Sequence, residues 1–450
     1  MAQKLFAIRS RIALSVLLIV LPIAALLSTH DEVSRAQVPI GPNIMIILTD
    51  DQRGDWQSMR LLKKTREIFK DNGRYYPNAV ATTPLCCPSR ASIFSGQYAH
   101  NHGVFINNGN NFDTTHSIQY ELQKLGYYTG FVGKYLSKVK TAPEYWSQWA
   151  TMNDGGSYYN SRFKINGYRE MSYYETNFVS NTAVDFLRGF ETSDDRPWML
   201  FVAPRAPHLP ANPERKYRRA AIGRWERTPA TRETDLSDKP PRVQRVKNKP
   251  KTIRQQRTTQ LRSLLSVDDL VGNLFKTMAN LNEQNTLAFF LSDNGYMWLE
   301  HGLKRKSYPY DGSVEIPFYV RWPGHIDEGT TDRRIVGNID VAPTIYDSQV
   351  TGATPAYQVD GRSLFDPVKR DYIMVEYGGD DIVPYQGLWA PNETYVEYDD
   401  GFREYYGRND PWELENPLGN DTVADDPPQT FQLGLMLMGY SDCVGPADCP

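Results

Sequence analysis

The most informative stretch of this 450-residue sequence is Cys86-Cys87-Pro88-Ser89-Arg90-Ala91-Ser92-Ile93-Phe94-Ser95-Gly96. Proline is tolerated in the first turn of a helix, so the run predicts a short helix over Ser89–Ser95 with Cys86 at its N-terminal end. Backbone N–H groups and the helix dipole attract anions at such an end. The guanidinium of Arg90 adds a planar fork that suits oxyanions. The stretch therefore predicts a reactive, anion-binding position at Cys86.

Two other interpretations of the cysteine pair follow from the residues alone. Buried free cysteines are common, so Cys86 and Cys87 could simply be half-buried residues that precede a helix. An unmodified cysteine at a helix N-terminus could also be an activated thiolate. The length and asymmetry of the pattern, Cys-x-Pro-Ser-Arg-Ala-Ser-x-x-x-Gly, favour a functional motif over the first of these interpretations.

Short apolar runs alternate with helix-like stretches along most of the chain. The apolar runs are Asn43–Leu48, Gly130–Val132, Trp198–Val202, Leu287–Leu291 and Phe318–Val320, and the helix-like stretches are Ser117–Leu125, Asn177–Leu187, Arg262–Leu281 and Val341–Tyr346. Strands that alternate with helices indicate an α/β fold with a mostly parallel sheet flanked by helices. In such sheets ligands bind beyond the carboxyl ends of the strands.

The pattern changes after about residue 368. Tyr372–Tyr377 is a candidate strand, and the segments 394–398 and 402–406 flank the turn Asp399-Asp400-Gly401, which predicts a hairpin. We therefore predict a catalytic domain over residues 37–368 and a smaller antiparallel C-terminal subdomain over residues 369–450.

Residues 218–260 are rich in Arg, Lys, Pro and Thr and contain few large apolar side chains. This composition predicts a long surface loop. Such a loop is either a lid over the site or a solvated charged insertion, and length alone does not separate the two.

Residues 1–36 have the features of a secretion signal. A basic start is followed by the apolar run Ile12–Leu27 and by the small-x-small sequence Ser34-Arg35-Ala36 before Gln37. The length of the apolar run also fits an uncleaved membrane anchor. Export favours a terminal disulfide between Cys443 and Cys449, since no histidine or further cysteine lies nearby to form a zinc site.

The chain has a net charge of −3, which argues against a general nucleic-acid binder. It contains 28 tyrosines and 9 tryptophans, so some aromatic rings could line a sugar-binding cleft beside those in the core.

Hard oxygen ligands follow two of the predicted strands. Asp50 and Asp51 come after the first strand, and Asp293 and Asn294 follow Leu287–Leu291. Adjacent carboxylates repel each other, and three carboxylates with one amide form a site that suits Ca²⁺ or Mg²⁺. Each pair also has a plainer interpretation, since Asn-Gly is a turn dipeptide and two aspartates can lie in a solvated loop.

Three further polar residues lie near strand ends: Lys134, His208 and Lys306. An anionic ester requires cations on its oxygens and a proton donor for the departing alcohol. Taken singly, each lysine could simply lie at the protein surface, and His208 could simply lie in a loop.

Together these residues resemble the type I sulfatases, over roughly Asn43 to Leu414. In that family the first cysteine of the motif is oxidised to formylglycine by a formylglycine-generating enzyme, and the hydrate of this aldehyde attacks sulfur. The resemblance implies an alkaline-phosphatase-like fold and a sulfated small molecule or glycan as the substrate. The fragments Cys-Cys-Pro-Ser-Arg and Gly-Lys-Tyr-Leu look most like the N-acetylglucosamine-6-sulfatase branch.

The resemblance also assigns roles to individual residues. It implies that formylglycine at position 86, Asp50, Asp51, Asp293 and Asn294 hold the cation. Arg90, Lys134, His208 and Lys306 match the residues that this family places around the sulfate, and either His208 or Lys306 would protonate the departing alcohol.

One position departs from the family pattern. Many arylsulfatases have Gly-Lys-x-His, whose histidine helps to collapse the sulfated intermediate, but this chain has Leu136 at that place. We consider His100, His102 and His301 as replacements for this base, and each could equally be structural or bind the substrate.

The sequence thus predicts a sulfuric ester hydrolase that acts on a sulfated sugar or an aryl sulfate. A formylglycine-dependent hydrolase of phosphate or phosphonate monoesters is the nearest alternative. Phosphatases with paired zinc ions fit less well, because the chain has only seven histidines. A binder of sulfated glycans that leaves Cys86 unmodified is the alternative from a different functional class.

Overall fold

A ten-stranded sheet forms the centre of the protein in its computed structural model. The structure describes residues 41–139, 144–152, 156–165, 168–170, 173–192, 196–379, 381–419 and 426–450, so the predicted signal segment 1–36 lies outside the described residues. In spatial order the strands are β13 (Thr330–Thr331), β2 (Arg74–Tyr75), β12 (Phe318–Arg321), β9 (Thr286–Ser292), β1 (Asn43–Thr49), β8 (Trp198–Ala203), β4 (Tyr128–Gly133), β5 (Gln148–Met152), β6 (Arg162–Lys164) and β7 (Tyr168–Glu170).

The middle of this sheet is parallel. Strands β9, β1, β8, β4 and β5 run in one direction, while β12 pairs antiparallel with β9, and β6 pairs antiparallel with β5. All five predicted apolar runs are strands of this sheet, so the prediction of a mostly parallel α/β sheet is confirmed. Two-stranded pairs join β3 (Ala79–Val80) to β14 (Val336–Gly337) and β10 (Met297–Trp298) to β11 (Lys304–Arg305).

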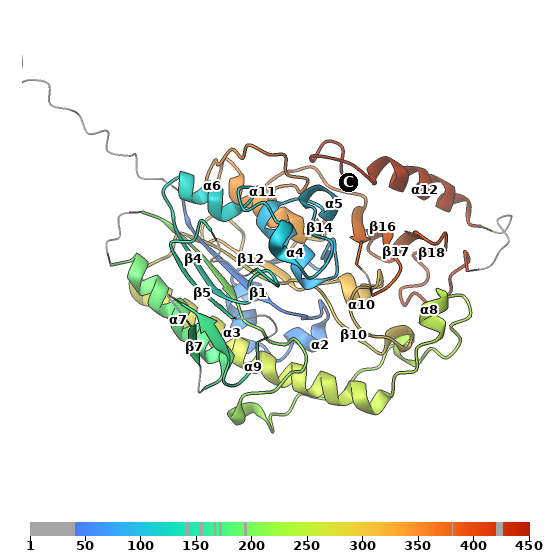
Figure 1. Cartoon of the computed structure of the whole chain (residues 1–450), viewed down its shortest axis with the longest axis horizontal. Coiled ribbons are helices and arrows are strands. Elements are labelled where there is room, and N and C mark those ends of the chain that lie inside the picture. The colour runs from blue at the N-terminus through green and yellow to red at the C-terminus, as the bar shows by residue number, and fades with distance from the viewer. Residues whose placement is uncertain are drawn as a thin grey trace, which may run out of the picture. The chain divides into compact units, whose positions relative to one another are not determined.

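Helices cover both faces of the sheet, which is why its central strands are apolar throughout. Successive side chains of a strand point to opposite faces, so Ile44, Ile46 and Leu48 of β1 pack on one face, while Met45 and Ile47 pack on the other. The first face is covered by α4 (Cys86–Ser95), α6 (Ile118–Lys124) and α11 (Val341–Tyr346), and the second by α7 (Glu175–Phe190) and α9 (Pro250–Leu281), as Figure 1 shows.

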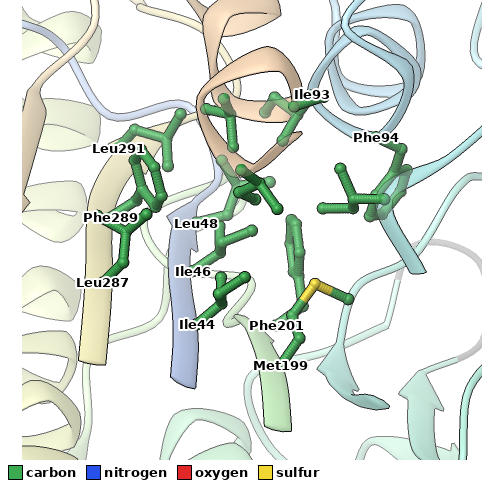
Figure 2. Packing of buried hydrophobic residues seen from close by; sticks show 14 of the residues in the cluster. Ile44, Ile46, Leu48, Ile93, Phe94, Met199, Phe201, Leu287, Phe289 and Leu291 are labelled. Atoms are coloured by element: carbon green, nitrogen blue, oxygen red, sulfur yellow. The ribbon is translucent and has the colours of Figure 1, made fainter. Parts of the chain in front are cut away.

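Figure 2 shows the packing of the first face from close by. Ile44, Ile46 and Leu48 of β1 lie between the side chains of β9 and Phe201 of β8, and Ile93 and Phe94 of α4 lie across from them. The helix that contains the cysteine motif is therefore fixed to the sheet by its own apolar residues. This packing places the N-terminus of α4 near the carboxyl ends of the central strands.

A second sheet follows in the C-terminal part of the chain. Its four antiparallel strands are, in order, β15 (Ile373–Tyr377), β16 (Tyr385–Ala390), β17 (Glu393–Tyr398) and β18 (Arg403–Tyr406), followed by α12 (Pro428–Tyr440). The predicted strand and hairpin are confirmed, as is the disulfide between Cys443 and Cys449. The hydrophobic core of this sheet also contains Val80, Leu85 and Val314 from the preceding part. The domain boundary at residue 368 stays a prediction.

The segment 218–260 differs from the prediction. Helix α9 begins at Pro250 rather than at Arg262, so the last eleven residues of the predicted loop are helical. Proline fits the first position of a helix, and Ile253 and Leu261 are buried at helical spacing between polar residues. Polar side chains on the other faces hide this pattern in the sequence. Residues 218–249 contain the short helices η4 (Ala230–Arg232) and α8 (Pro241–Gln244).

None of the helices in the described ranges combines the length and the apolar character needed to span a bilayer.

Candidate active site

Cys86 is the first residue of α4, as the motif predicts. The helix ends before Gly96, which adopts the left-handed backbone conformation (φ 74°) that favours glycine. The Cys86 side chain is 3% exposed. Its thiol donates to Asp50 Oδ1 over 3.2 Å, and Lys306 Nζ donates to Cys86 Sγ over 2.6 Å.

The electrostatic surroundings keep this thiol protonated. Burial raises the pKa of Cys86 most, and the carboxylates of Asp293 and Asp50 raise it further, while Lys134 and Lys306 only partly oppose them. These groups therefore disfavour an activated thiolate at Cys86.

The ends of β1 and β9 bring four oxygen-bearing side chains to the same place. The backbone N–H of Asp51 donates to Asp293 Oδ1 over 3.1 Å, and Asn294 Nδ2 donates to Asp51 Oδ1 over 2.8 Å. Asp51 adopts a left-handed backbone conformation (φ 68°), which is uncommon for a residue with a Cβ atom and occurs often at functional sites. The predicted oxygen ligands Asp50, Asp51, Asp293 and Asn294 thus form one buried cluster.

Three permanent cations surround these carboxylates. Arg90 Nε pairs with Asp293 Oδ2 at 2.9 Å, Lys134 Nζ pairs with Asp50 Oδ2 at 2.5 Å, and Lys306 Nζ pairs with Asp51 Oδ1. The ion pairs join residues that lie far apart in the sequence, because each residue sits at or near the carboxyl end of a strand or at the start of α4. The structure brings Arg90, Lys134 and Lys306 together as predicted.

Gly133 at the end of β4 makes the position of Lys134 possible. Its φ is 120°, and a Cβ atom added there would lie 2.0 Å from the carbonyl oxygen of Ala203 in β8. Only glycine allows this approach, after which the backbone N–H of Lys134 donates to the same carbonyl over 2.8 Å.

The carboxylates of the cluster have pKa values shifted in different directions. Burial raises the pKa of Asp50, but Lys134, His208, Arg90 and Lys306 together hold it well below its ordinary value. At Asp293, burial and the charge of Asp50 outweigh Arg90, so its pKa is raised. Burial lowers the pKa of Lys306, but Asp51 and its neighbours raise it well above the ordinary value, so this lysine stays charged.

His208 lies at the rim of the cluster. Its Nε2 is 3.8 Å from Asp51 Oδ2, and its Nδ1 is 3.3 Å from Arg205 Nη2. Burial lowers the pKa of His208 to about 4 against the opposing charges of Asp50 and Asp51. The ligand atoms of Asp50, Asp51, Cys86 and His208 all lie within 4.8 Å of one another, a separation that one metal ion could bridge.

A cleft of about 750 Å³ opens onto Asp51, His208 and Lys306. Its other polar lining includes Asn107, Tyr296 and the α9 residues Thr252, Gln255, Gln256 and Thr259. The sequence prediction missed these residues. The spacing i, i+3, i+4, i+7 of the four α9 residues is the signal that could have identified them, because it places them on one helix face. Asn107 offered no such signal; its Oδ1 accepts from the backbone N–H of Cys87 over 3.0 Å.

The three candidates for a replacement base have other partners. His100 pairs with Glu376 at 3.1 Å, His102 Nε2 lies 3.0 Å from Ser92 Oγ, and His301 Nδ1 pairs with Glu233 Oε2 at 2.6 Å. Within the described chain, none of these histidines lines the cleft. Leu136, which stands where many arylsulfatases have a histidine, is 5% exposed and packs in the hydrophobic core.

Comparison with known proteins agrees with this geometry. The family model named Sulfatase matches residues 42–348. The chain belongs to the sulfatase family. The N-acetylglucosamine-6-sulfatase of Homo sapiens is 32% identical over 390 residues, which cover 77% of this chain and 67% of the relative. The extracellular sulfatase SULF-1 homolog of Drosophila melanogaster is 33% identical over 349 residues, covering 72% of this chain but 31% of the relative. The chain thus spans only part of the length of such relatives.

Solved structures show the same fold. A protein solved in complex with its substrate D-glucosamine-2-N,6-O-disulfate aligns with a TM-score of 0.74 and 22% identity, covering 88% of this chain and 97% of that one. Phosphonate monoester hydrolases share the fold as well. The predicted family and the alkaline-phosphatase-like fold class are therefore confirmed.

Proposed function

We propose that this sulfatase-family chain hydrolyses a sulfate ester, with the residue at position 86 as the nucleophile after oxidation to formylglycine. The observation that carries this proposal is the placement of Cys86: a buried side chain at a helix N-terminus, in contact with Asp50 and Lys306. In the modified protein, the hydroxyls of the hydrated aldehyde would take the place that Sγ holds. A formylglycine-generating enzyme is then a partner during maturation.

The oxygen cluster fits a hard divalent cation, which we propose to be Ca²⁺, with Mg²⁺ as the alternative. Asn294 Oδ1 is buried and has no hydrogen-bond partner among the described residues, although its amide nitrogen donates to Asp51. An unpaired buried carbonyl beside three carboxylates is the arrangement that a cation with oxygen ligands satisfies. Such an ion would polarise the nucleophile and the sulfate oxygens.

The remaining residues have distinct proposed roles. Arg90 is fixed by Asp293 and orients the nucleophile, while Lys134 and Lys306 stay charged and neutralise sulfate oxygens. The raised pKa of Lys306 makes it a weak acid, so His208 is the better donor of a proton to the departing alcohol. A bound sulfate anion would favour the protonated form of His208.

The second half of the reaction requires a base that removes a proton from the remaining hydroxyl. Leu136 lies in the core, and His100, His102 and His301 are held elsewhere. We infer that His208, neutral once it has protonated the alcohol, takes this proton as sulfate departs.

The relatives narrow the proposed substrate. One is named N-acetylglucosamine-6-sulfatase, and a protein of the same fold was solved with a sulfated glucosamine. We propose a sulfated sugar of this class, with an aryl sulfate as the less specific substrate. The extracellular relative and the features of residues 1–36 support export of this chain. We keep the proposed division into a catalytic domain, 37–368, and a C-terminal subdomain, 369–450.

A comparison of leaving-group-matched esters tests the proposed activity against its nearest rival. Purified, modified enzyme should hydrolyse 4-nitrophenyl sulfate with a kcat/KM at least about tenfold above that for 4-nitrophenyl phosphate or a phenyl phosphonate. A preference for phosphate or phosphonate would instead support the monoester hydrolase alternative. Binding of sulfated sugars without turnover of any ester would support the non-catalytic binder.

Loss of the oxygen cluster should remove metal and activity together. The double variant Asp50→Asn, Asp293→Asn keeps side-chain size but removes two charges, so bound Ca²⁺ should fall by at least about tenfold. Elemental analysis of the purified protein and 4-nitrophenyl sulfate turnover are the measurements. Chelation should inhibit, and Ca²⁺ or Mg²⁺ should restore activity better than Zn²⁺.

A matched control removes a buried carboxylate elsewhere. Asp360 is fully buried and accepts from the backbone N–H of Tyr98 over 2.8 Å. Asp360→Asn should leave the metal content unchanged. Unaltered metal content in the double variant would refute the proposed ligand set.

A further inference from the structure

A second pocket, of about 480 Å³, lies beside α9 and is lined mainly by arginine. Its arginines are Arg224, Arg227, Arg232, Arg254, Arg257 and Arg262, and its other lining residues are Ile222, Gly223, Trp225 and Thr258. Among the described residues, no acidic side chain lines this pocket. None of the six guanidiniums forms an ion pair with a carboxylate within 4.0 Å in the described ranges.

The two acidic side chains that act on Arg257 are paired with other cations. Glu226 pairs with Arg60 at 2.8 Å, and Asp55 pairs with Arg53 at 3.0 Å. Asp55 and Glu226 therefore compensate the charge of Arg257 only in part, and none of the six arginines has a carboxylate partner of its own among the described residues. A folded chain gathers like charges in one concave place most readily when an anion binds there.

Arg257 supplies an independent observation. Its side chain is 1% exposed, and its Nε has no hydrogen-bond partner among the described residues. Its Nη2 donates to Gln57 Oε1 over 3.2 Å, and its guanidinium lies 5.3 Å from the centre of the Trp298 ring. Burial and the neighbouring Arg60 lower the pKa of Arg257 to about 10. A buried cation without a counter-charge is unfavourable, so this residue also points to a missing anion.

We propose that the pocket is a second, non-catalytic site that binds sulfate groups of an anionic glycan. Arginine forks bind sulfate oxygens in pairs, and the ring of Trp225, with Arg227 5.6 Å from its centre, offers an aromatic face to a sugar. The pocket volume exceeds that of a sulfate ion alone. The proposal rests on the proposed function, because a substrate that carries several sulfates is what links this pocket to the catalytic cleft.

Helix α9 provides that link in the structure. Thr252, Gln255, Gln256 and Thr259 face the catalytic cleft, while Arg254, Arg257, Thr258 and Arg262 of the same turns line the arginine pocket. The two sites therefore lie on different faces of the first three turns of this helix, which runs along the lower edge of the molecule in Figure 1. A glycan long enough to cross α9 would therefore reach both sites.

The test variant is the triple substitution Arg224→Gln, Arg232→Gln, Arg254→Gln. These three side chains are exposed, so the fold should persist, and the unfolding temperature verifies this. The control is Arg188→Gln, Arg333→Gln, Arg408→Gln, which removes the same charge from exposed positions outside the pocket. Binding of a heparin-derived octasaccharide is measured by calorimetry in the Cys86→Ala background, so that no turnover occurs.

We expect the triple variant to bind the octasaccharide at least tenfold more weakly, and the control less than twofold more weakly. With Cys86 intact, the triple variant should hydrolyse 4-nitrophenyl sulfate within twofold of the wild type. Equal loss in the triple variant and the control, or no loss in either, would overturn the proposal.

Two further probes separate the sources of the anion. If inorganic sulfate shows the same dependence on the three arginines and the octasaccharide binds no more tightly, the pocket is a small-anion site and the glycan proposal fails. Equally tight, equally arginine-dependent binding of a single-stranded oligonucleotide of the same charge would also overturn it. Absence of sulfatase activity with intact arginine-dependent octasaccharide binding would refute the proposed function and leave this binding site standing.

Discussion

Replacement of Cys86 by alanine should abolish sulfate ester hydrolysis while the protein remains folded. The side chain is the proposed nucleophile, and loss of a nucleophile lowers kcat by at least about 1,000-fold. Sγ forms hydrogen bonds with Asp50, Asp51 and Lys306, and Cys86 belongs to none of the hydrophobic clusters among the described residues, so its removal leaves the core intact. The measurements are 4-nitrophenyl sulfate turnover and the circular dichroism unfolding curve.

The adjacent cysteine provides the matched control. Cys87 is also buried, but its side chain packs in the core on the inner face of α4. Cys87→Ala should lower stability modestly, by about 1 kcal/mol, and keep most of the activity. Full activity in Cys86→Ala would refute the assignment of the nucleophile, whereas equal inactivation by both substitutions would indicate damage to α4.

A leaving-group comparison should separate the roles of His208. Protonation of the departing oxygen matters little for nitrophenol and greatly for an alkyl sugar alcohol. His208→Ala should therefore lower kcat/KM, which reports only the first half of the reaction, by about 100-fold or more for a glucosamine-6-sulfate substrate and by less than about tenfold for 4-nitrophenyl sulfate. Initial rates on both substrates, at concentrations well below KM, are the measurement.

A different result would change the role assigned to His208. Equal losses of kcat/KM on both substrates would assign His208 to sulfate binding, and Lys306 would become the better candidate for the acid. His102→Ala is a control for loss of a buried imidazole, since His102 contacts Ser92 within the fold and does not line the cleft.

The sequence predicted the central sheet well because its strands are buried on both faces. Runs such as Asn43–Leu48 and Leu287–Leu291 are apolar throughout, and the polar residues that end them mark the carboxyl edge of the sheet. From this pattern, the cysteine motif and the family resemblance we predicted nine site residues, and the structure places them close together. Their chemical roles remain proposals.

The start of α9 could not be predicted in the same way. Its first three turns are dominated by Arg, Gln and Thr, so the few apolar residues of the buried face, such as Ile253 and Leu261, did not indicate a helix, and the spacing of the cleft-lining residues was overlooked. The surroundings of His100, His102 and His301 could not be predicted either, because they depend on tertiary structure. Each could act as a base by its residue type, but Glu376 and Glu233 from distant segments bind His100 and His301, and Ser92 binds His102.

The central claim is that position 86 holds formylglycine, and a mass spectrum of the tryptic peptide containing this residue tests it most directly. The protein should be purified from its natural host or from a host that contains a formylglycine-generating enzyme. We predict a peptide in which the thiol of Cys86 is replaced by an aldehyde, with sulfur exchanged for oxygen and two hydrogens lost, and which reacts with a hydrazide probe. An active preparation in which Cys86 is entirely an unmodified cysteine would contradict the account.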